Sequence, residues 1–225
     1  MKFFGEGFSE KHDELKKIIR NREKLSEAKQ LFLALHASVH RSLVSGSPRN
    51  EVDALFDDLQ PQDYYFAPSP ASKPVAYHVW HLARIEDLTM NILMSGGEQV
   101  FNPDWQDKIN AGITDTGNAL TPAQAVELSK RINAKSLLYY RCAVGIRTRE
   151  LVAKLSADDM RRKPSPESLD RLLTEGGLTE EADSIWLRDF WGKKDAAGLL
   201  LLPPTRHAVM HLNDCVKNTQ RPFHP

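Results

Sequence analysis

Residues 76–88 read Ala76-Tyr-His-Val-Trp-His-Leu-Ala-Arg-Ile-Glu-Asp-Leu88, and the spacing of their apolar residues and histidines is that of an α-helix. We predict a helix over about residues 74–95. Pro74 suits its first turn, where a missing backbone N–H costs nothing, and Gly96-Gly97 supplies the end. One face of this helix carries His78, His81, Ile85, Leu88 and Ile92.

Three further segments carry the helical period, at about residues 22–45, 121–155 and 205–218, and a shorter helical piece is expected over 50–59. Thr121-Pro122-Ala123-Gln124 has the spacing of a capping box, with proline at the first helical position. No segment shows the alternation of a strand. We therefore predict an all-α protein, a four-helix bundle in a single domain over residues 1–225.

Two insertions interrupt the predicted bundle. Residues 98–120 separate the second and third helices, and residues 156–202 separate the third and fourth. The second insertion is long enough to hold short helices of its own, which we expect around 167–173 and 182–191. Its Trp186, Phe190 and Trp191 indicate that it packs onto the bundle.

Composition excludes several classes of protein. The 225 residues contain 30 Lys plus Arg and 30 Asp plus Glu, so the formal net charge is zero and no basic excess points to nucleic acid or to an anionic membrane surface. No apolar run reaches the roughly 18 residues of a membrane span. Cys142 and Cys215 are isolated, which disfavours a disulfide framework or a thiolate zinc site and favours a cytoplasmic location. Zero net charge also permits self-association.

His207 and His211 form the most informative pair of residues. Side chains four apart on a helix are neighbours, so both imidazoles can reach one ion. Ala208 stands where zinc proteases of this spacing carry their glutamate base, which argues against a protease. A third ligand must come from elsewhere, and the second helix offers His78 and His81. Three neutral imidazoles suit Zn, Ni, Fe or Cu, and they leave coordination positions on the ion open. The competing interpretation is that these histidines bind no metal and are satisfied by hydrogen bonds within the protein.

Other histidines and charged residues have plainer interpretations. His36 and His40 repeat the same spacing on the first helix. They could face the same interior and extend the site, but we favour the interpretation that they flank the helix's apolar stripe. His12 and His224 near the termini are expected to be solvated. No glutamate stands three residues before any helical histidine, which disfavours a carboxylate di-iron centre. Asp214 is a candidate to orient His211, and Arg84 a candidate for an anionic group. For both we favour the simpler reading, a solvated carboxylate and a salt-bridged or solvated arginine.

The two histidine segments resemble a known family. In residues 76–88 a histidine precedes Leu-Ala and then acidic residues, and Thr205-Arg-His-Ala-Val-Met-His-Leu-Asn213 carries an HxxxH motif. Both are similar to the DinB-like superfamily of damage-inducible helical bundles. The resemblance implies a four-helix bundle, often a homodimer, that binds a divalent metal through three histidines. By motif position these are His81, His207 and His211, with His78 outside the pattern.

Characterised members of that family include bacillithiol- and mycothiol-dependent S-transferases and a thiol-dependent maleylpyruvate isomerase. The resemblance therefore implies a transferase that uses Zn, Ni or Fe and a low-molecular-weight thiol on a small electrophilic substrate. It assigns no catalytic residue. The alternative is a non-catalytic protein, either a metal-binding or a stress-induced dimeric binding protein. Residues 156–202 depart from the family pattern, and we expect them to shape or cover the pocket.

Overall fold

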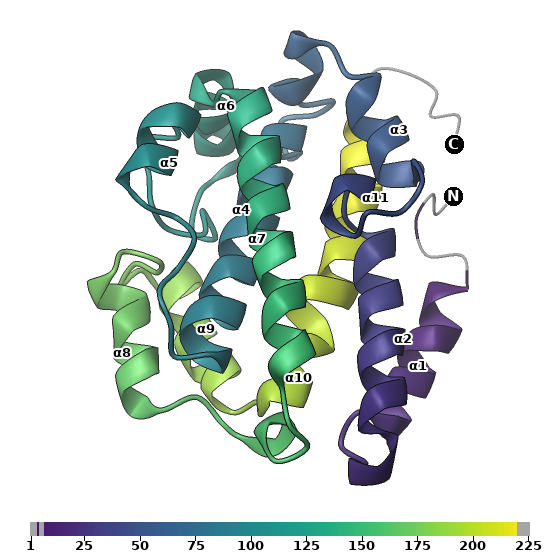
Figure 1. Cartoon of the computed structure of the whole chain (residues 1–225). Coiled ribbons are helices and arrows are strands. Elements are labelled where there is room, and N and C mark those ends of the chain that lie inside the picture. The colour runs from purple at the N-terminus through teal and green to yellow at the C-terminus, as the bar shows by residue number, and fades with distance from the viewer. Residues whose placement is uncertain (1–3, 5–6, 220–225) are drawn as a thin grey trace.

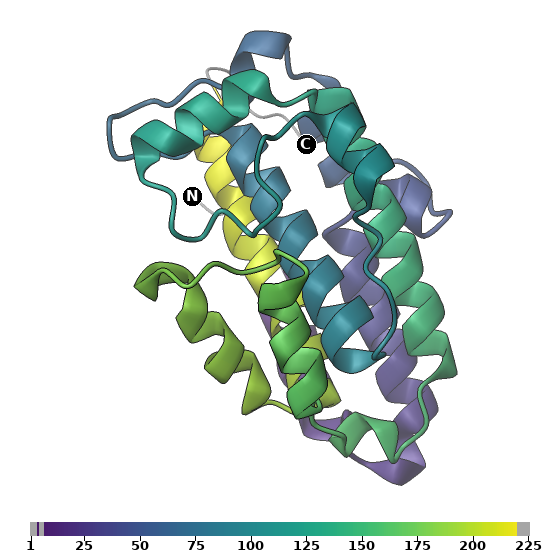
Figure 2. The same ribbon diagram turned by 90° about the vertical axis from the view of Figure 1, so that its left-hand side faces the viewer.

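A computed structural model describes residue 4 and residues 7–219, and over these residues the chain is helical with no strand. The helices α2 (Leu25–Ser38), α4 (Val75–Asp87), α7 (Ala134–Lys154) and α11 (Ala208–Asn218) run roughly parallel to one another, as Figures 1 and 2 show. Within the described residues, no helix combines the length and the apolar composition needed to cross a lipid bilayer.

Shorter elements complete the chain. The helices are α1 (Phe8–Ile18), α3 (Glu51–Asp57), α5 (Pro103–Ile109), α6 (Pro122–Arg131), α8 (Pro166–Thr174), α9 (Ala182–Gly192) and α10 (Ala196–Leu200). Two π-helical turns span Leu88–Met94 and Leu202–His207, and 3₁₀ turns span Arg22–Lys24, Ser42–Val44, Pro61–Tyr64 and Asp159–Arg161. In Figure 2, α5 and α6 cross one end of the long helices, whereas α8 and α9 lie beside their other half.

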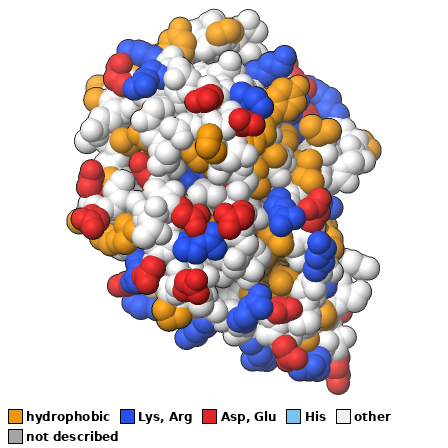
Figure 3. All heavy atoms as spheres, turned by 60° about the vertical axis from the view of Figure 1, so that its left-hand side comes forward, with side chains coloured by type: hydrophobic (Ala, Val, Ile, Leu, Met, Phe, Trp, Pro, Cys, Tyr) orange, Lys and Arg blue, Asp and Glu red, His pale blue; other side chains and the backbone are white. Residues whose placement is uncertain are grey.

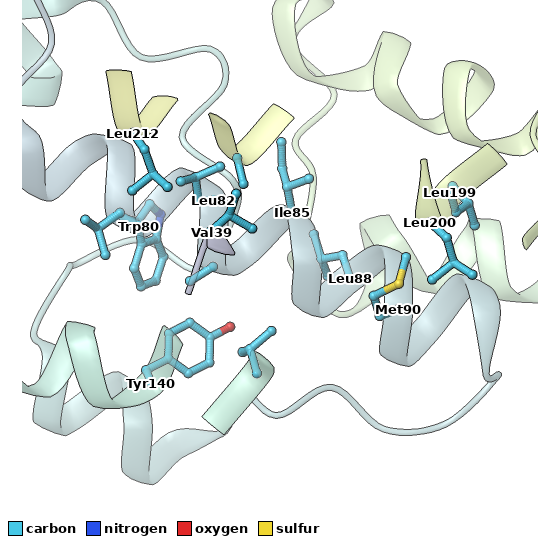
Figure 4. Close-up of a cluster of buried hydrophobic side chains, with 14 of the residues drawn as sticks. Val39, Trp80, Leu82, Ile85, Leu88, Met90, Tyr140, Leu199, Leu200 and Leu212 are labelled. Atoms are coloured by element: carbon cyan, nitrogen blue, oxygen red, sulfur yellow. The ribbon is translucent and has the colours of Figure 1, made fainter. Parts of the chain in front are cut away.

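The core forms around α4. Every residue of this helix is buried, because α7, α11 and α6 all pack against it. Figure 4 shows Trp80 and Leu82 of α4 between Leu212 of α11 and Tyr140 of α7. A helix buried on all sides has no face for unpaired polar groups, so its polar side chains must find partners inside the protein. By contrast, the face drawn in Figure 3 has Lys and Arg side chains interspersed with Asp and Glu.

Two predicted helices are shorter in the structure. The segment predicted over 121–155 divides into α6 and α7, because the backbone turns extended at Ile132 and Asn133 and the Asn133 side chain caps α7 by accepting from Ser136 N at 3.0 Å. The segment predicted over 22–45 ends as an α-helix at Ser38. There the Asn50 amide donates to the carbonyl of His40 at 2.8 Å, satisfying a carbonyl that a longer helix would have paired.

Other expectations are confirmed or corrected at single elements. The predicted 74–95 helix appears as α4 followed directly by the π-helical turn Leu88–Met94, and the short helices expected in the second insertion appear as α8 and α9. Trp191 is buried, but Trp186 is largely exposed and packs edge-on against Phe190. The amphipathic helix α1 was not predicted, because its four buried residues stand among charged residues and its apolar periodicity is therefore weak.

Candidate metal centre

Three histidines from distant parts of the chain converge beside α4. His81 lies in α4, His207 ends the π-helical turn Leu202–His207, and His211 lies in the first turn of α11. Each offers a ring nitrogen within 4.8 Å of the other two. The Nε2 atoms of His207 and His211 lie 3.0 Å apart, the separation of two bonds of roughly 2.1 Å that meet at about 90°. The three residues therefore fit a transition-metal ion.

His81 is oriented by the backbone of the first insertion. Its Nδ1 lies 2.9 Å from the carbonyl of Thr116. A carbonyl only accepts hydrogen bonds, so Nδ1 carries the proton and Nε2 presents its lone pair to the other two histidines. Hydrogen bonds of this kind fix both the tautomer and the orientation of metal-binding imidazoles.

The second insertion holds that carbonyl in place. Thr116 N donates to the carbonyl of Gly177 at 3.1 Å, and Thr114 Oγ1 donates to the carbonyl of Gly176 at 2.9 Å. Nearby, the Trp80 indole donates to the carbonyl of Asp115 at 2.9 Å. Residues 114–116 of the first insertion and 176–177 of the second thus act together on the orientation of His81, a role that the sequence did not reveal.

His78 lies behind His211. Their Nδ1 atoms are 2.7 Å apart, which suits a hydrogen bond and is shorter than the roughly 2.9 Å between two nitrogens bound to one ion at right angles. With Nε2 of His211 directed at His207, Nδ1 of His211 is the donor and His78 the acceptor. The sequence left the choice between His78 and His81 open, and this geometry gives His78 an orienting position.

Asp214 makes a second arrangement geometrically possible. Its carboxylate belongs, with His78 and His211, to another group whose donor atoms lie within 4.8 Å. However, the carboxylate is partly exposed and accepts from Lys217 Nζ at 2.7 Å, in agreement with the simpler reading of Asp214. We therefore take His81, His207 and His211 as the candidate centre.

Burial keeps these imidazoles neutral. Loss of hydration, together with the neighbouring histidines, lowers the pKa of His81 and of His207 to about 3 and that of His211 to about 2. Neutral imidazole is the form that binds metals. Nδ1 of His207 is buried and has no hydrogen-bond partner in the described part of the chain.

These lowered pKa values predict that metal affinity changes little with pH. A site of three histidines with ordinary pKa values would bind its metal ~1000-fold more weakly at pH 5.5 than at pH 7.5, because protons compete for each nitrogen. Here we expect a change below about tenfold, measured by isothermal titration with Zn²⁺ across that range. A loss near ~1000-fold would contradict it.

The metal-free protein itself behaves differently with pH. The unfolded chain takes up protons at these histidines below about pH 6.5, whereas the folded chain does not until much lower pH, so the free energy of unfolding falls as pH drops below that value. Circular dichroism at each pH therefore has to confirm that the protein titrated is folded.

A second buried cluster joins α2 to α4. Nε2 of His36 and Nε2 of His40 each lie 2.9 Å from a different oxygen of the Glu86 carboxylate, and all three side chains are buried. Burial alone would raise the pKa of Glu86, but the electrostatic interactions and hydrogen bonds with His40 and His36 outweigh that effect and hold the pKa well below its usual value. Burial lowers the pKa of His40 to about 3.

This cluster changes the interpretation of His36 and His40. They do not merely flank the apolar stripe of the first helix, because they bind a buried carboxylate that the sequence did not single out. The three residues are also arranged closely enough to hold an ion. However, the two rings stack at 4.2 Å, each facing its own oxygen, which is the geometry of two N–H donors on one carboxylate. They lie apart from the three converging histidines.

The remaining candidates are also placed. Arg84 is fully buried, donating to the carbonyl of Thr114 at 2.8 Å and to the Tyr140 hydroxyl at 3.0 Å, so it is a structural residue and not a binding one. His12, expected to be solvated, is buried, with Nε2 2.7 Å from the carbonyl of Leu201. His224 lies outside the described residues.

These features define a class of protein: an all-helical chain with a three-histidine group that can hold a metal ion. The family model of the DinB superfamily matches residues 47–172, more than half of the chain, and the chain belongs to that superfamily. The match includes His78 and His81 and ends before His207 and His211. Among curated proteins none matches the chain.

Proposed function

We propose that this protein is a metal-dependent transferase that uses a low-molecular-weight thiol on a small electrophile. The observation that carries the proposal is the convergence of three neutral imidazoles from α4, from the π-helical turn Leu202–His207 and from α11. We propose that His81, His207 and His211 bind a single Zn, Ni or Fe ion, within one domain whose four-helix bundle consists of α2, α4, α7 and α11. We further propose that the protein is a homodimer located in the cytoplasm.

The accessibility of the centre supports catalysis over a purely structural role. His81 is buried, whereas His207 and His211 are only partly buried, so part of each of these two residues is exposed to solvent. Three protein ligands leave coordination positions for a small molecule. A bound divalent ion supplies Lewis acidity, which lowers the pKa of a coordinated thiol and favours its nucleophilic thiolate.

The chain's own residues have separate tasks in this scheme. His81, fixed by Thr116, and His211, fixed by His78, hold their lone pairs toward one point and so keep the centre rigid. Burial keeps both imidazoles from taking the proton that a thiol would release, so that proton leaves to solvent or to the substrate.

Metal content and thiol binding test the proposal together. We expect mass spectrometry to find about one Zn, Ni or Fe per chain in protein purified without an affinity tag. After exchange for Co²⁺, addition of a thiol should produce a thiolate-to-cobalt absorption band, and a fluorogenic electrophile should then be consumed faster than by the thiol alone. Protein that takes up no ion excludes the transferase. Protein that binds metal but no thiol is instead the metal-binding protein of the alternative.

A further inference from the structure

We propose that Lys73 and Tyr77 form a subsite for an anionic group, namely a carboxylate carried by the thiol that binds at the three-histidine centre. This inference rests on the proposed function and adds the chemical class of its thiol. It comes from two polar side chains beside His81 whose hydrogen-bonding capacity the described protein leaves unused.

Lys73 is anchored where α4 and α11 meet. It stands just before α4, and its backbone carbonyl accepts a hydrogen bond from the Asn218 side chain of α11 at 2.6 Å. That same carbonyl hydrogen-bonds to His78. The Lys73 backbone is thus held against the helix that carries His211, and its half-buried side chain has a defined starting point.

Tyr77 connects Lys73 to the metal-binding histidines. Its ring stacks on that of His81, with centroids 5.6 Å apart and planes 14° from parallel. Gly117, at a φ of +68°, packs against the Tyr77 ring so closely that a Cβ there would lie 3.3 Å from a ring carbon. The ring is therefore fixed, and the Tyr77 hydroxyl has a set position beside the centre.

The two side chains together offer free donors. Lys73 Nζ donates to the Tyr77 hydroxyl at 3.0 Å and lies 4.4 Å from the centre of its ring. Because the hydroxyl oxygen accepts that bond, its own proton is available to another acceptor, as are two further N–H groups of Lys73. Burial raises the pKa of Tyr77, so the hydroxyl keeps its proton at neutral pH. Donors without an acceptor, side by side, suit a carboxylate.

The charge of Lys73 also favours an anionic ligand. Within the described chain no carboxylate lies within 4 Å of Lys73 Nζ, unlike Lys217, which pairs with Asp214. Asp183, exposed at the start of α9, acts on Lys73 from farther away. The ammonium lies close enough to the centre that its charge lowers the pKa of His78, His81 and His211. An ion at the centre adds to that positive charge, and a negatively charged ligand would balance it.

A pair of matched thiols tests this subsite on the full-length protein loaded with Co²⁺. The probes are 3-mercaptopropionate and 3-mercaptopropanol, which differ in the carboxylate, and the readout is the thiolate-to-cobalt band. We expect the carboxylate thiol to bind about tenfold more tightly. In Lys73→Met the preference should fall to about twofold, with the affinity for 3-mercaptopropanol unchanged, whereas Lys73→Arg should keep it.

Controls separate this inference from the proposed function. Lys130→Met, on the exposed surface of α6, should keep the preference, and the cobalt spectrum without thiol verifies that each variant has an intact centre. Two results would contradict the subsite while leaving thiol binding intact. One is equal affinity for the two thiols. The other is a preference for 3-mercaptopropionate that persists in Lys73→Met, because the thiol's own carboxylate would then chelate the metal. Failure of both thiols to produce the band in the native protein overturns the proposed function as well.

Discussion

Replacing His211 with alanine is expected to weaken metal binding by about 10³-fold. Structural zinc sites bind with roughly 10–16 kcal/mol in total, so the loss of one of three ligands removes about 4 kcal/mol. Both ring nitrogens of His211 are engaged in this geometry, because its Nε2 lies 3.0 Å from that of His207 and its Nδ1 lies 2.7 Å from Nδ1 of His78. Competition with a chromophoric chelator measures the change.

Three further variants test which histidines bind the ion. His78→Leu should cost only about 10–100-fold, since His78 orients His211 through its far nitrogen and does not itself bind the ion. His12→Gln should leave the affinity unchanged, because His12 bonds the carbonyl of Leu201 away from the centre. A larger loss in His78→Leu than in His81→Ala would instead assign the ion to His78, His211 and Asp214.

Replacing Glu86 with glutamine is expected to lower the free energy of unfolding by about 3 kcal/mol. The carboxylate accepts from both His36 and His40 in a fully buried position. An amide keeps one acceptor oxygen but turns an NH₂ group toward the second imidazole donor, which leaves a buried donor unpaired. Urea-induced unfolding at pH 7.5 measures the loss.

The matched control is Glu127→Gln on the exposed surface of α6, for which we expect a change within about 0.5 kcal/mol. If Glu86→Gln changes the free energy of unfolding by a comparably small amount, the cluster does not stabilise the packing of α2 against α4. Metal content gives a second readout, because this substitution should leave it unchanged. An equivalent of metal lost only in Glu86→Gln would show that His36, His40 and Glu86 hold an ion.

The helical class and much of the candidate centre could be predicted from local sequence. Helical periodicity is a property of neighbouring residues, so the region of α4, the apolar face of α2 and the short helices α8 and α9 were all predicted. The HxxxH spacing likewise placed His207 and His211 next to each other before any fold was known. The division of the 121–155 segment at Asn133 was missed, although asparagine is a common N-cap, because apolar spacing continues across it.

What the sequence determined about this protein is therefore whatever depends on spacing along one helix: its helical class and the pairing of His207 with His211. Only the tertiary structure decided which polar groups meet across helices. In the folded chain His81 lies beside His207 and His211, and His78 lies within hydrogen-bond distance of the other ring nitrogen of His211. The Glu86 carboxylate accepts hydrogen bonds from His36 and His40. The reason is physical: α4 is buried on every side, so periodicity distinguishes no outer face, and each polar side chain points to whichever neighbouring helix or insertion supplies its partner.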